Sequence, residues 1–184
     1  EGPCSNKEII DLRKRQRKNL MSSLILSPGI PMILMGDEVG RSQGGNNNTW
    51  CQDNILGWMI WDPVDCDLDL KRFVSKLIII RKSLPELFNP SYIHESSPKN
   101  PDLLLKDFWL EWHGVKINKP DWSSWSHTIS YSINLSDTGS VMWLGLNAYK
   151  EPIEFDLPSA ISPWKKIIDT ASSTTKGTPR KPIS

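Results

Sequence analysis

Residues 30–62 read IPMILMGDEVGRSQGGNNNTWCQDNILGWMIWD, and this stretch decides how the rest of the chain is interpreted. Residues 30–35 form a continuous apolar run, which is typical of a parallel strand buried on both faces. The loop that follows, residues 36–61, contains five glycines and three tryptophans. Loops of this length are either functional or disordered, and the interleaved tryptophans favour an ordered one. Because ligands of α/β barrels bind on loops at the carboxyl ends of strands, we predict a binding loop.

The segments on either side of this stretch predict two helices. Ser5 with Glu8 three residues later fits a capping box, so a helix is expected over residues 7–26. Its inner face should consist of residues at helical spacing: Ile9, Leu12, Gln16, Leu20 and Leu24. Asp67 is placed to cap a second helix over residues 68–82. That helix repeats the same spacing with Leu70, Phe73, Val74, Leu77, Ile78 and Arg81.

The order helix, strand, loop and helix predicts an α/β fold class for residues 1–88, as the C-terminal portion of a (β/α)8 TIM barrel. The pattern changes to short alternating runs after a proline-rich linker, so residues 89–184 are predicted to form an antiparallel β-sandwich domain, incomplete at its C-terminal end. Its strands are expected at residues 103–105, 128–133, 141–146, 153–157 and 164–168. The polar tail from about residue 171 is expected to be mobile.

Six loop residues are candidates for binding a polyhydroxylated ligand: Asn46, Asn47, Asn48, Trp50, Asp53 and Asn54. Each asparagine side chain has two donors and one acceptor, which match sugar hydroxyls. The indole of Trp50 offers a flat apolar face for the C–H side of a pyranose ring. A structural interpretation stays open for all six. Asparagine is common in turns, Asp53-Asn54 can cap a short helix, and Trp50 can pack against the loop.

Composition argues against several other function classes. The formal net charge is only +1, so no long-range field favours nucleic acid or a membrane surface. No run of 18 apolar residues exists, and neither the three histidines nor the three cysteines have metal-ligand spacing. We therefore predict no metal, no cofactor, no nucleic-acid partner and free thiols in a reducing compartment. The basic cluster at residues 13–18 is interpreted as a solvated helix surface with one or two buried ion pairs.

A family resemblance rests on motifs in their order along the chain: Met35-Gly36-Asp37-Glu38, Gly45-Asn46-Asn47-Asn48, Cys51-Gln52-Asp53-Asn54 and Trp61-Asp62. Together they resemble the last barrel strand and following loop of isoamylase-type glycogen and starch debranching enzymes, in glycoside hydrolase family 13. Further on, Trp112-His113-Gly114, Pro120-Asp121-Trp122-Ser123 and Ile167-Ile168-Asp169-Thr170 resemble the C-terminal β-domain of these enzymes.

The resemblance implies a function in cleaving the α-1,6 branch linkages of glycogen or amylopectin, in the cytoplasm or in the plastid stroma of a plant-type source. It also implies that the nucleophilic Asp, the acid/base Glu and a His-Asp pair lie on earlier strands. No His-Asp dipeptide occurs in the chain, which is therefore expected to be a fragment that lacks the catalytic residues. Its expected partners are a branched α-glucan and the missing N-terminal part of the enzyme. The alternatives are a non-catalytic glucan-binding or barrel-completing module, or a degenerate gene remnant.

Asp37 and Glu38 are not predicted to be a catalytic pair. A retaining glycosidase needs two carboxyl groups about 5–5.5 Å apart across one bond. Adjacent residues of an extended chain point to opposite sides. We expect these two side chains to orient the loop or to cap a helix.

Overall fold

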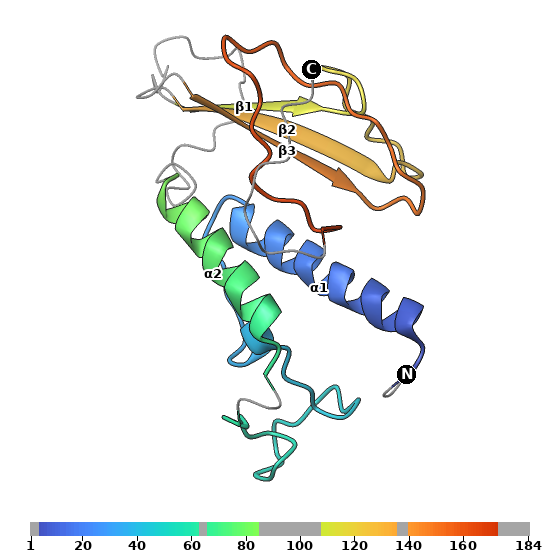
Figure 1. Cartoon of the computed structure of the whole chain (residues 1–184), viewed down its shortest axis with the longest axis vertical. Coiled ribbons are helices and arrows are strands. Elements are labelled where there is room, and N and C mark those ends of the chain that lie inside the picture. The colour runs from blue at the N-terminus through green and yellow to red at the C-terminus, as the bar shows by residue number, and fades with distance from the viewer. Residues whose placement is uncertain (1–3, 63–65, 85–107, 136–139, 173–184) are drawn as a thin grey trace. The chain divides into compact units, whose positions relative to one another are not determined.

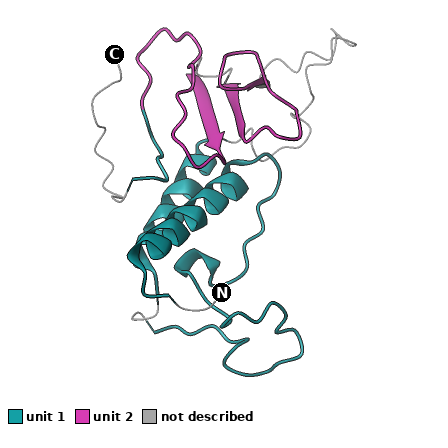
Figure 2. Ribbon diagram, turned by 90° about the vertical axis from the view of Figure 1, so that its right-hand side faces the viewer, with its two compact units in different colours: residues 1–88, 166–181 teal, residues 89–165, 182–184 magenta. Residues whose placement is uncertain are grey.

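A computed structural model describes residues 4–62, 66–84, 108–135 and 140–172. The chain divides into two compact units, shown in different colours in Figure 2. Unit 1 comprises residues 1–88 and 166–181, and unit 2 comprises residues 89–165 and 182–184. Each unit is described by itself.

Unit 1 is built on two helices that pack side by side, α1 (Lys7–Leu26) and α2 (Leu68–Lys82), as Figure 1 shows. Both predicted helices are therefore confirmed. The cap of α2 is also as predicted, because the Asp67 carboxylate accepts a hydrogen bond from the Leu70 N–H at 3.0 Å. The cap of α1 is not Ser5 but Asn6, whose side-chain oxygen accepts from the Glu8 N–H at 2.9 Å. Asparagine and serine cap equally well, so sequence alone chose the wrong neighbour.

The two helices differ in how well their inner faces were predicted. In α2, five of the six predicted positions are buried, and only Ile78 is half-exposed. In α1 the predicted face is exposed, and the buried residues are instead Lys18, Ser22, Ile25 and Leu26. The reason is that α1 turns this second face toward α2. The predicted apolar face requires a barrel sheet, which the described residues do not form.

The predicted strand at residues 30–35 is wrong for this structure, since these residues have no sheet partner among those described. Ile30 and Met32 are 88% and 87% exposed. A parallel strand exists only through hydrogen bonds to neighbouring strands, so an apolar run alone does not make one. The barrel portion of the predicted fold class is therefore not confirmed. A short 3₁₀ helix, η1 (Asp37–Val39), follows this segment.

The end of η1 is held against the start of α2. The Asp67 N–H donates to the Val39 carbonyl at 2.8 Å. Gly40 has a φ of 76°, and a Cβ there would lie 2.3 Å from the Arg17 guanidinium. Glycine is required at this position both by the left-handed backbone and by the close approach of Arg17.

Unit 2 contains a three-stranded antiparallel sheet in the order β1-β2-β3, with β1 (Phe108–His113), β2 (Thr128–Leu135) and β3 (Ser140–Asn147). The predicted strands at 128–133 and 141–146 are confirmed within β2 and β3. The predicted strands at 153–157 and 164–168 are wrong, since neither segment joins a sheet among the described residues. Residues 103–105, the tail beyond residue 172 and its expected mobility lie outside the described residues.

A second sheet is not seen in the described part of the chain, so the sandwich is not confirmed. Residues 153–157 instead contribute Phe155, whose ring makes an edge contact with Trp143 of β3 at 5.6 Å between centroids. The Asp156 N–H donates to the Val115 carbonyl just after β1. This segment therefore covers unit 2 as extended chain without adding a strand to its sheet.

Candidate functional site

The loop at residues 36–61 is closed at its base by one arginine. The Arg41 guanidinium donates to the carbonyls of Gly57, at 2.6 Å, and Leu56, at 3.3 Å. The Arg41 side chain lies close to Gly36, which has a φ of 100°. A Cβ at position 36 would lie 2.7 Å from the Arg41 side chain. The two ends of the loop are thus fixed to each other across 15 or 16 residues of sequence.

Three of the four candidate asparagines use their side-chain oxygens inside the loop. Asn46 accepts from the Asn48 N–H at 2.9 Å, and Asn48 accepts from the Trp50 N–H at 3.1 Å. Asn54 accepts from the Leu56 N–H at 2.9 Å. The Asn46 amide also donates to the Gln52 side chain at 3.1 Å. These are local turn bonds, which matches the structural interpretation left open for these positions.

Asn47 differs from its two neighbours. Its side chain is exposed and forms no hydrogen bond with the described residues. Its donors and its acceptor are therefore not used to hold the loop. The turn bonds of Asn46 and Asn48 hold the backbone on either side of it. Of the four asparagines, Asn47 is the one most available to a ligand.

Trp50 and Asp53 line an open hollow of about 430 Å³ on the loop. Its full lining is Thr49, Trp50, Cys51, Gln52, Asp53, Gly57 and Trp58. Trp50 is 95% exposed, so its indole does not pack against the loop. Asp53 accepts a hydrogen bond from the Trp58 indole N–H at 2.8 Å, which fixes the second ring of the hollow. The structure thus brings two candidates together, while Asn46, Asn47, Asn48 and Asn54 do not line this hollow.

Sequence reasoning did not select Trp58 or Gln52 as site residues. Trp58 is eight residues after Trp50, and no periodicity links two positions of an irregular loop. The available signal was the Asp53 side chain, since a buried or half-buried indole N–H usually finds an acceptor nearby. Gln52 lines the hollow, and its side-chain oxygen accepts a hydrogen bond from the Asn46 amide.

The structural role expected of Glu38 is confirmed, whereas that of the Asp37 side chain stays a prediction. The Glu38 carboxylate accepts from the Gly36 N–H at 2.9 Å and so steadies the first turn of η1. Asp37 is the first residue of η1, and its carbonyl accepts from the Gly40 N–H. Neither side chain lines the hollow.

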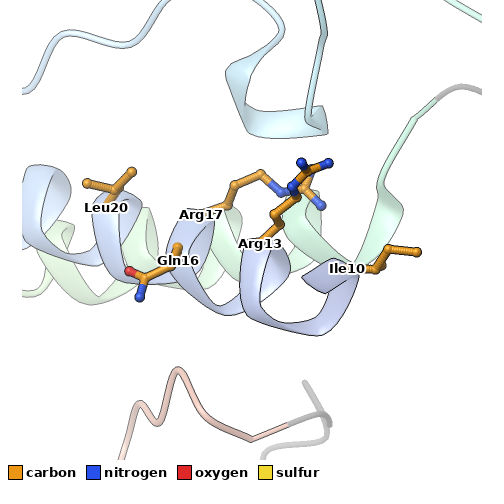
Figure 3. Close-up of a pocket in the computed structure, with 5 residues that line it drawn as sticks. All are labelled: Ile10, Arg13, Gln16, Arg17 and Leu20. Carbon is orange, nitrogen blue, oxygen red and sulfur yellow. The ribbon is translucent and has the colours of Figure 1, made fainter. Parts of the chain in front are cut away.

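A second hollow, of about 490 Å³, follows one side of α1. Figure 3 shows Arg13 and Arg17 extending from this side of the helix, with Gln16 and Leu20 further along it. Arg17 binds Asp67 at 2.9 Å, and the nearly buried Lys18 binds Asp69 at 2.9 Å. The basic cluster therefore supplies two ion pairs that join α1 to the start of α2, as its sequence interpretation expected.

The described residues contain no group of three metal-ligating side chains placed to hold a metal ion. Within that same part of the chain, no helix is both long enough and apolar enough to cross a membrane. The three cysteines are unpaired, and Cys51 is exposed in the loop hollow.

His113 is a structural residue. It lies at the end of β1 and is completely buried. Its Nδ1 accepts from the Asn118 N–H at 3.0 Å, and its Nε2 lies 2.9 Å from the Ser132 hydroxyl. Because Nδ1 is an acceptor, the ring proton is on Nε2, which donates to Ser132.

Comparisons with known proteins place the chain among related sequences. Residues 111–176 match the family model described as Isoamylase 1-3, C-terminal. Over 175 residues the chain is 34% identical to isoamylase 1, chloroplastic, of Oryza sativa subsp. japonica, covering 92% of this chain and 20% of that protein. Over 129 residues it is 38% identical to the glycogen debranching enzyme of Pectobacterium atrosepticum, covering 70% of this chain and 18% of that protein.

A mycobacterial relative gives a similar result. The glycogen operon protein GlgX homolog of Mycobacterium tuberculosis is 40% identical over 123 residues, covering 66% of this chain and 17% of that protein. The chain therefore spans about a fifth of the length of the curated relatives it matches. Similarity to isoamylases extends over both units, because the alignment with the rice protein covers most of the chain.

Proposed function

We propose that this chain, which belongs over most of its length to the family of isoamylases and glycogen debranching enzymes, supplies one wall of the glucan-binding cleft of such an enzyme. The observation that carries the proposal is the loop hollow with its exposed Trp50. An exposed indole beside a hollow with polar side chains offers a flat apolar face to a ligand, and binding sites typically combine aromatic surface with a few polar groups.

The proposed ligand is a branched α-glucan such as glycogen or amylopectin. The face of Trp50 stacks on the C–H side of one glucose unit, and Trp58 forms the opposite boundary of the hollow. Asp53 holds the Trp58 ring in place through the indole N–H and leaves its other oxygen to accept from a sugar hydroxyl. The free carboxamide of Asn47 donates to or accepts from a hydroxyl of a neighbouring unit.

Hydrolysis of the α-1,6 branch linkage is proposed for the complete enzyme and not for this chain alone. The two-carboxylate mechanism needs a nucleophile and an acid/base group on opposite sides of the bond. Glu38 is committed to the backbone of η1, and neither it nor Asp37 lines the hollow. The catalytic carboxylates would come from a segment corresponding to the upstream part of the relatives, and no cofactor is required.

That upstream barrel segment is the second proposed partner. The exposed apolar face of α1 and the apolar segment at residues 30–35 are the surfaces it would cover. A strand at residues 30–35 would then gain its hydrogen-bonding neighbours, as a parallel strand requires. We propose a cytoplasmic location, or the plastid stroma in a plant-type source, by analogy with the chloroplastic relative.

The experiment that tests this function is reconstitution. The chain is produced alone and together with the upstream portion of the rice isoamylase, and reducing ends released from amylopectin are measured. We expect no release by the chain alone and release by the reconstituted pair. Activity of the chain alone that disappears in Asp37→Asn or Glu38→Gln would contradict our assignment of both residues.

Loop variants test the ligand role. Trp50→Ala should weaken glucan binding about threefold to tenfold, since aromatic stacking is worth on the order of 0.5–1.5 kcal/mol beyond area burial. Asn47→Ala should weaken it about fivefold, the equivalent of one net hydrogen bond of about 1 kcal/mol. Isothermal titration with a branched maltooligosaccharide measures both.

Asn46→Ala is the matched control. It removes the bonds to Gln52 and to the Asn48 N–H and should lower the thermal stability of the loop. Asn47→Ala should leave the melting temperature unchanged. If Asn47→Ala and Trp50→Ala both lower stability without changing glucan affinity, the loop is structural and the proposed binding role is wrong.

A non-catalytic glucan-binding or barrel-completing module is the second candidate. The observation in its favour is that the hollow is formed wholly by residues of this chain. Glucan binding by the chain, with no activity after reconstitution, would support the module. If the chain neither binds glucan nor becomes active on reconstitution, only the interpretation as a gene remnant is left.

A further inference from the structure

An exposed aromatic surface lies on unit 2, in the turn between β1 and β2. Residues 120–127 read PDWSSWSH. Trp122 is 64% exposed and Trp125 is 75% exposed, although both are large apolar side chains. Trp112, near the end of β1, is also partly exposed, at 38%. Neither Trp122 nor Trp125 contributes to the loop hollow of unit 1.

The Trp122 ring has a defined position. Its centroid lies 5.4 Å from that of Trp112, at an interplanar angle of 74°. Trp112 in turn makes an edge contact with the buried Tyr131 of β2 at 5.5 Å. Trp122 is thus anchored to the sheet through two ring contacts while most of its surface stays in water. A ring fixed before binding loses little conformational entropy when a ligand covers it.

The backbone around the two tryptophans is also fixed. The Asp121 carboxylate accepts from the Ser123 N–H at 3.0 Å, and the Ser126 N–H donates to the Ser123 carbonyl at 3.0 Å. The Ser126 hydroxyl donates to the Thr128 carbonyl at 3.2 Å, which ties the turn to the start of β2. Trp122 and Trp125 therefore project from a hydrogen-bonded turn and not from a loose segment.

Two serines separate the two tryptophans, and Asp121 precedes the first of them. The exposed side chains include Asp121 and Ser124. The hydroxyl of Ser124 forms no hydrogen bond with the described residues, and the exposed Asp121 carboxylate accepts from the Ser123 N–H. Hydrogen bonds from Ser123 lower the pKa of Asp121, so this carboxyl is an acceptor at neutral pH.

We propose that Trp122 and Trp125 form a second carbohydrate-binding platform, which holds a linear part of an α-glucan chain. Carbohydrate is favoured over a protein partner because the centres of protein interfaces are depleted in Ser and Asp, whereas here these residues alternate with the indoles. The identity of the sugar as an α-glucan rests on the proposed function. The platform itself rests only on the exposed rings and their polar neighbours.

The platform adds affinity without adding chemistry. Each indole stacks on one pyranose face, and Asp121 and Ser124 bind hydroxyls at the ring edges. Different outer chains of one glycogen particle can bind the platform and the loop hollow. Two linked contacts raise the overall affinity above that of either one alone, whereas a short oligosaccharide cannot gain this advantage.

The test is glycogen affinity of the intact chain, measured by gel electrophoresis in glycogen-containing gels. Trp125→Ala should weaken glycogen binding about threefold to tenfold. Trp122→Ala/Trp125→Ala should weaken it further. Trp125→Tyr keeps an aromatic face and should retain most of the affinity. Near-ultraviolet circular dichroism is the control for packing. It should be unchanged in Trp125→Ala, because the Trp125 ring is mostly in solvent and the packed pair is Trp122 and Trp112.

The results separate this proposal from the proposed function. If Trp125→Ala weakens glycogen binding further in a chain that already carries Trp50→Ala, the result supports two independent sites. Glycogen binding that depends on Trp50 but is unchanged by Trp122→Ala/Trp125→Ala overturns the platform and leaves the proposed function standing. A change in self-association with unchanged glycogen binding identifies the surface as a protein interface and also overturns the platform.

Discussion

At the residue scale, the side chain of Arg81 caps the C-terminal end of α1. It lies near the end of α2, is 2% exposed, and reaches the C-terminal end of α1. Its guanidinium donates to the carbonyls of Ile25, Ser27 and Gly29, with a distance of 2.7 Å to Ser27. Ile25 lies in the last turn of α1, whose carbonyls have no donor within the helix, and Ser27 and Gly29 lie just beyond the helix end. The cation also complements the negative end of the helix dipole.

Arg81→Met should therefore destabilise unit 1 by about 2–4 kcal/mol. The methionine keeps the apolar stem but removes the donor to the buried bond at Ile25 and to the part-buried bonds at Ser27 and Gly29. A buried polar group left without a partner costs about 1–3 kcal/mol. Urea unfolding followed by circular dichroism measures the loss. Arg72→Met, on the exposed side of α2, is the control and should change the free energy of unfolding by less than about 0.5 kcal/mol. Equal effects of both variants would contradict the capping role of Arg81.

Tyr131 provides a pH-dependent test of the core of unit 2. Burial raises its pKa from 10.0 to about 12. Since the unfolded state then loses its proton first, the contribution of Tyr131 to stability is complete below pH 10 and is lost as the pH rises through 12. The shift of about two units corresponds to about 3 kcal/mol. The free energy of unfolding should fall more steeply between pH 10 and 12 in the wild type than in Tyr131→Phe, and parallel curves would contradict this.

Sequence reasoning worked best for residues whose role is local. Asp67 was correctly predicted as a cap because a capping side chain bonds to the backbone three residues away. Arg81 was placed on the inner face of α2 by its spacing, but its partners at residues 25–29 lie more than 50 positions away in sequence. No local pattern identifies such partners.

At the scale of elements, helices were predicted more reliably than strands. Helix hydrogen bonds form within the segment, so α1 and α2 follow from spacing and caps. Strands depend on partners elsewhere in the chain. Residues 153–157 alternate between apolar and polar side chains like a strand. They join no strand of the described sheet, and Phe155 packs against Trp143. β1 was missed because its sequence, FWLEWH, does not alternate regularly between apolar and polar residues.

The exposed face of α1 leads to a prediction about this helix. Leu20 is 70% exposed and belongs to the face that was predicted to pack on a barrel sheet. Leu20→Lys should leave the helix content and stability of the isolated chain almost unchanged. It should reduce capture of the chain by the co-expressed upstream portion of an isoamylase by roughly tenfold or more, since burying an unpaired charge is costly. A pull-down with quantitative blotting measures the capture.

Lys14→Glu is the matched control on the same helix, because Lys14 is exposed and lies away from that face. It should not reduce capture. Equal loss in both variants would mean that charge in general, and not the apolar face of α1, governs association with the upstream portion.

At the scale of the whole molecule, each unit has a small core and a large exposed apolar surface. The buried apolar residues of unit 1 are Ile25, Leu26, Val39, Leu70, Phe73, Val74, Leu77 and Leu84. In the same unit, Ile30, Met32, Trp50 and Trp61 are at least 75% exposed. The sequence predicted this imbalance, because two helices with barrel-facing sides were expected without the strands to receive them. Its prediction of which face of α1 is buried was wrong.

This imbalance predicts the behaviour of the isolated chain. Soluble monomers rarely expose contiguous apolar patches larger than a few hundred Å², so the chain alone should self-associate. Size-exclusion chromatography with light scattering should show oligomers whose mass rises with protein concentration. Co-expression with the upstream portion of an isoamylase should shift the chain into a single complex, because we propose that this portion covers α1 and residues 30–35. A monomer that melts in one sharp transition would show that the two units satisfy their apolar surfaces unaided, and the barrel-completing role would then lose its physical basis.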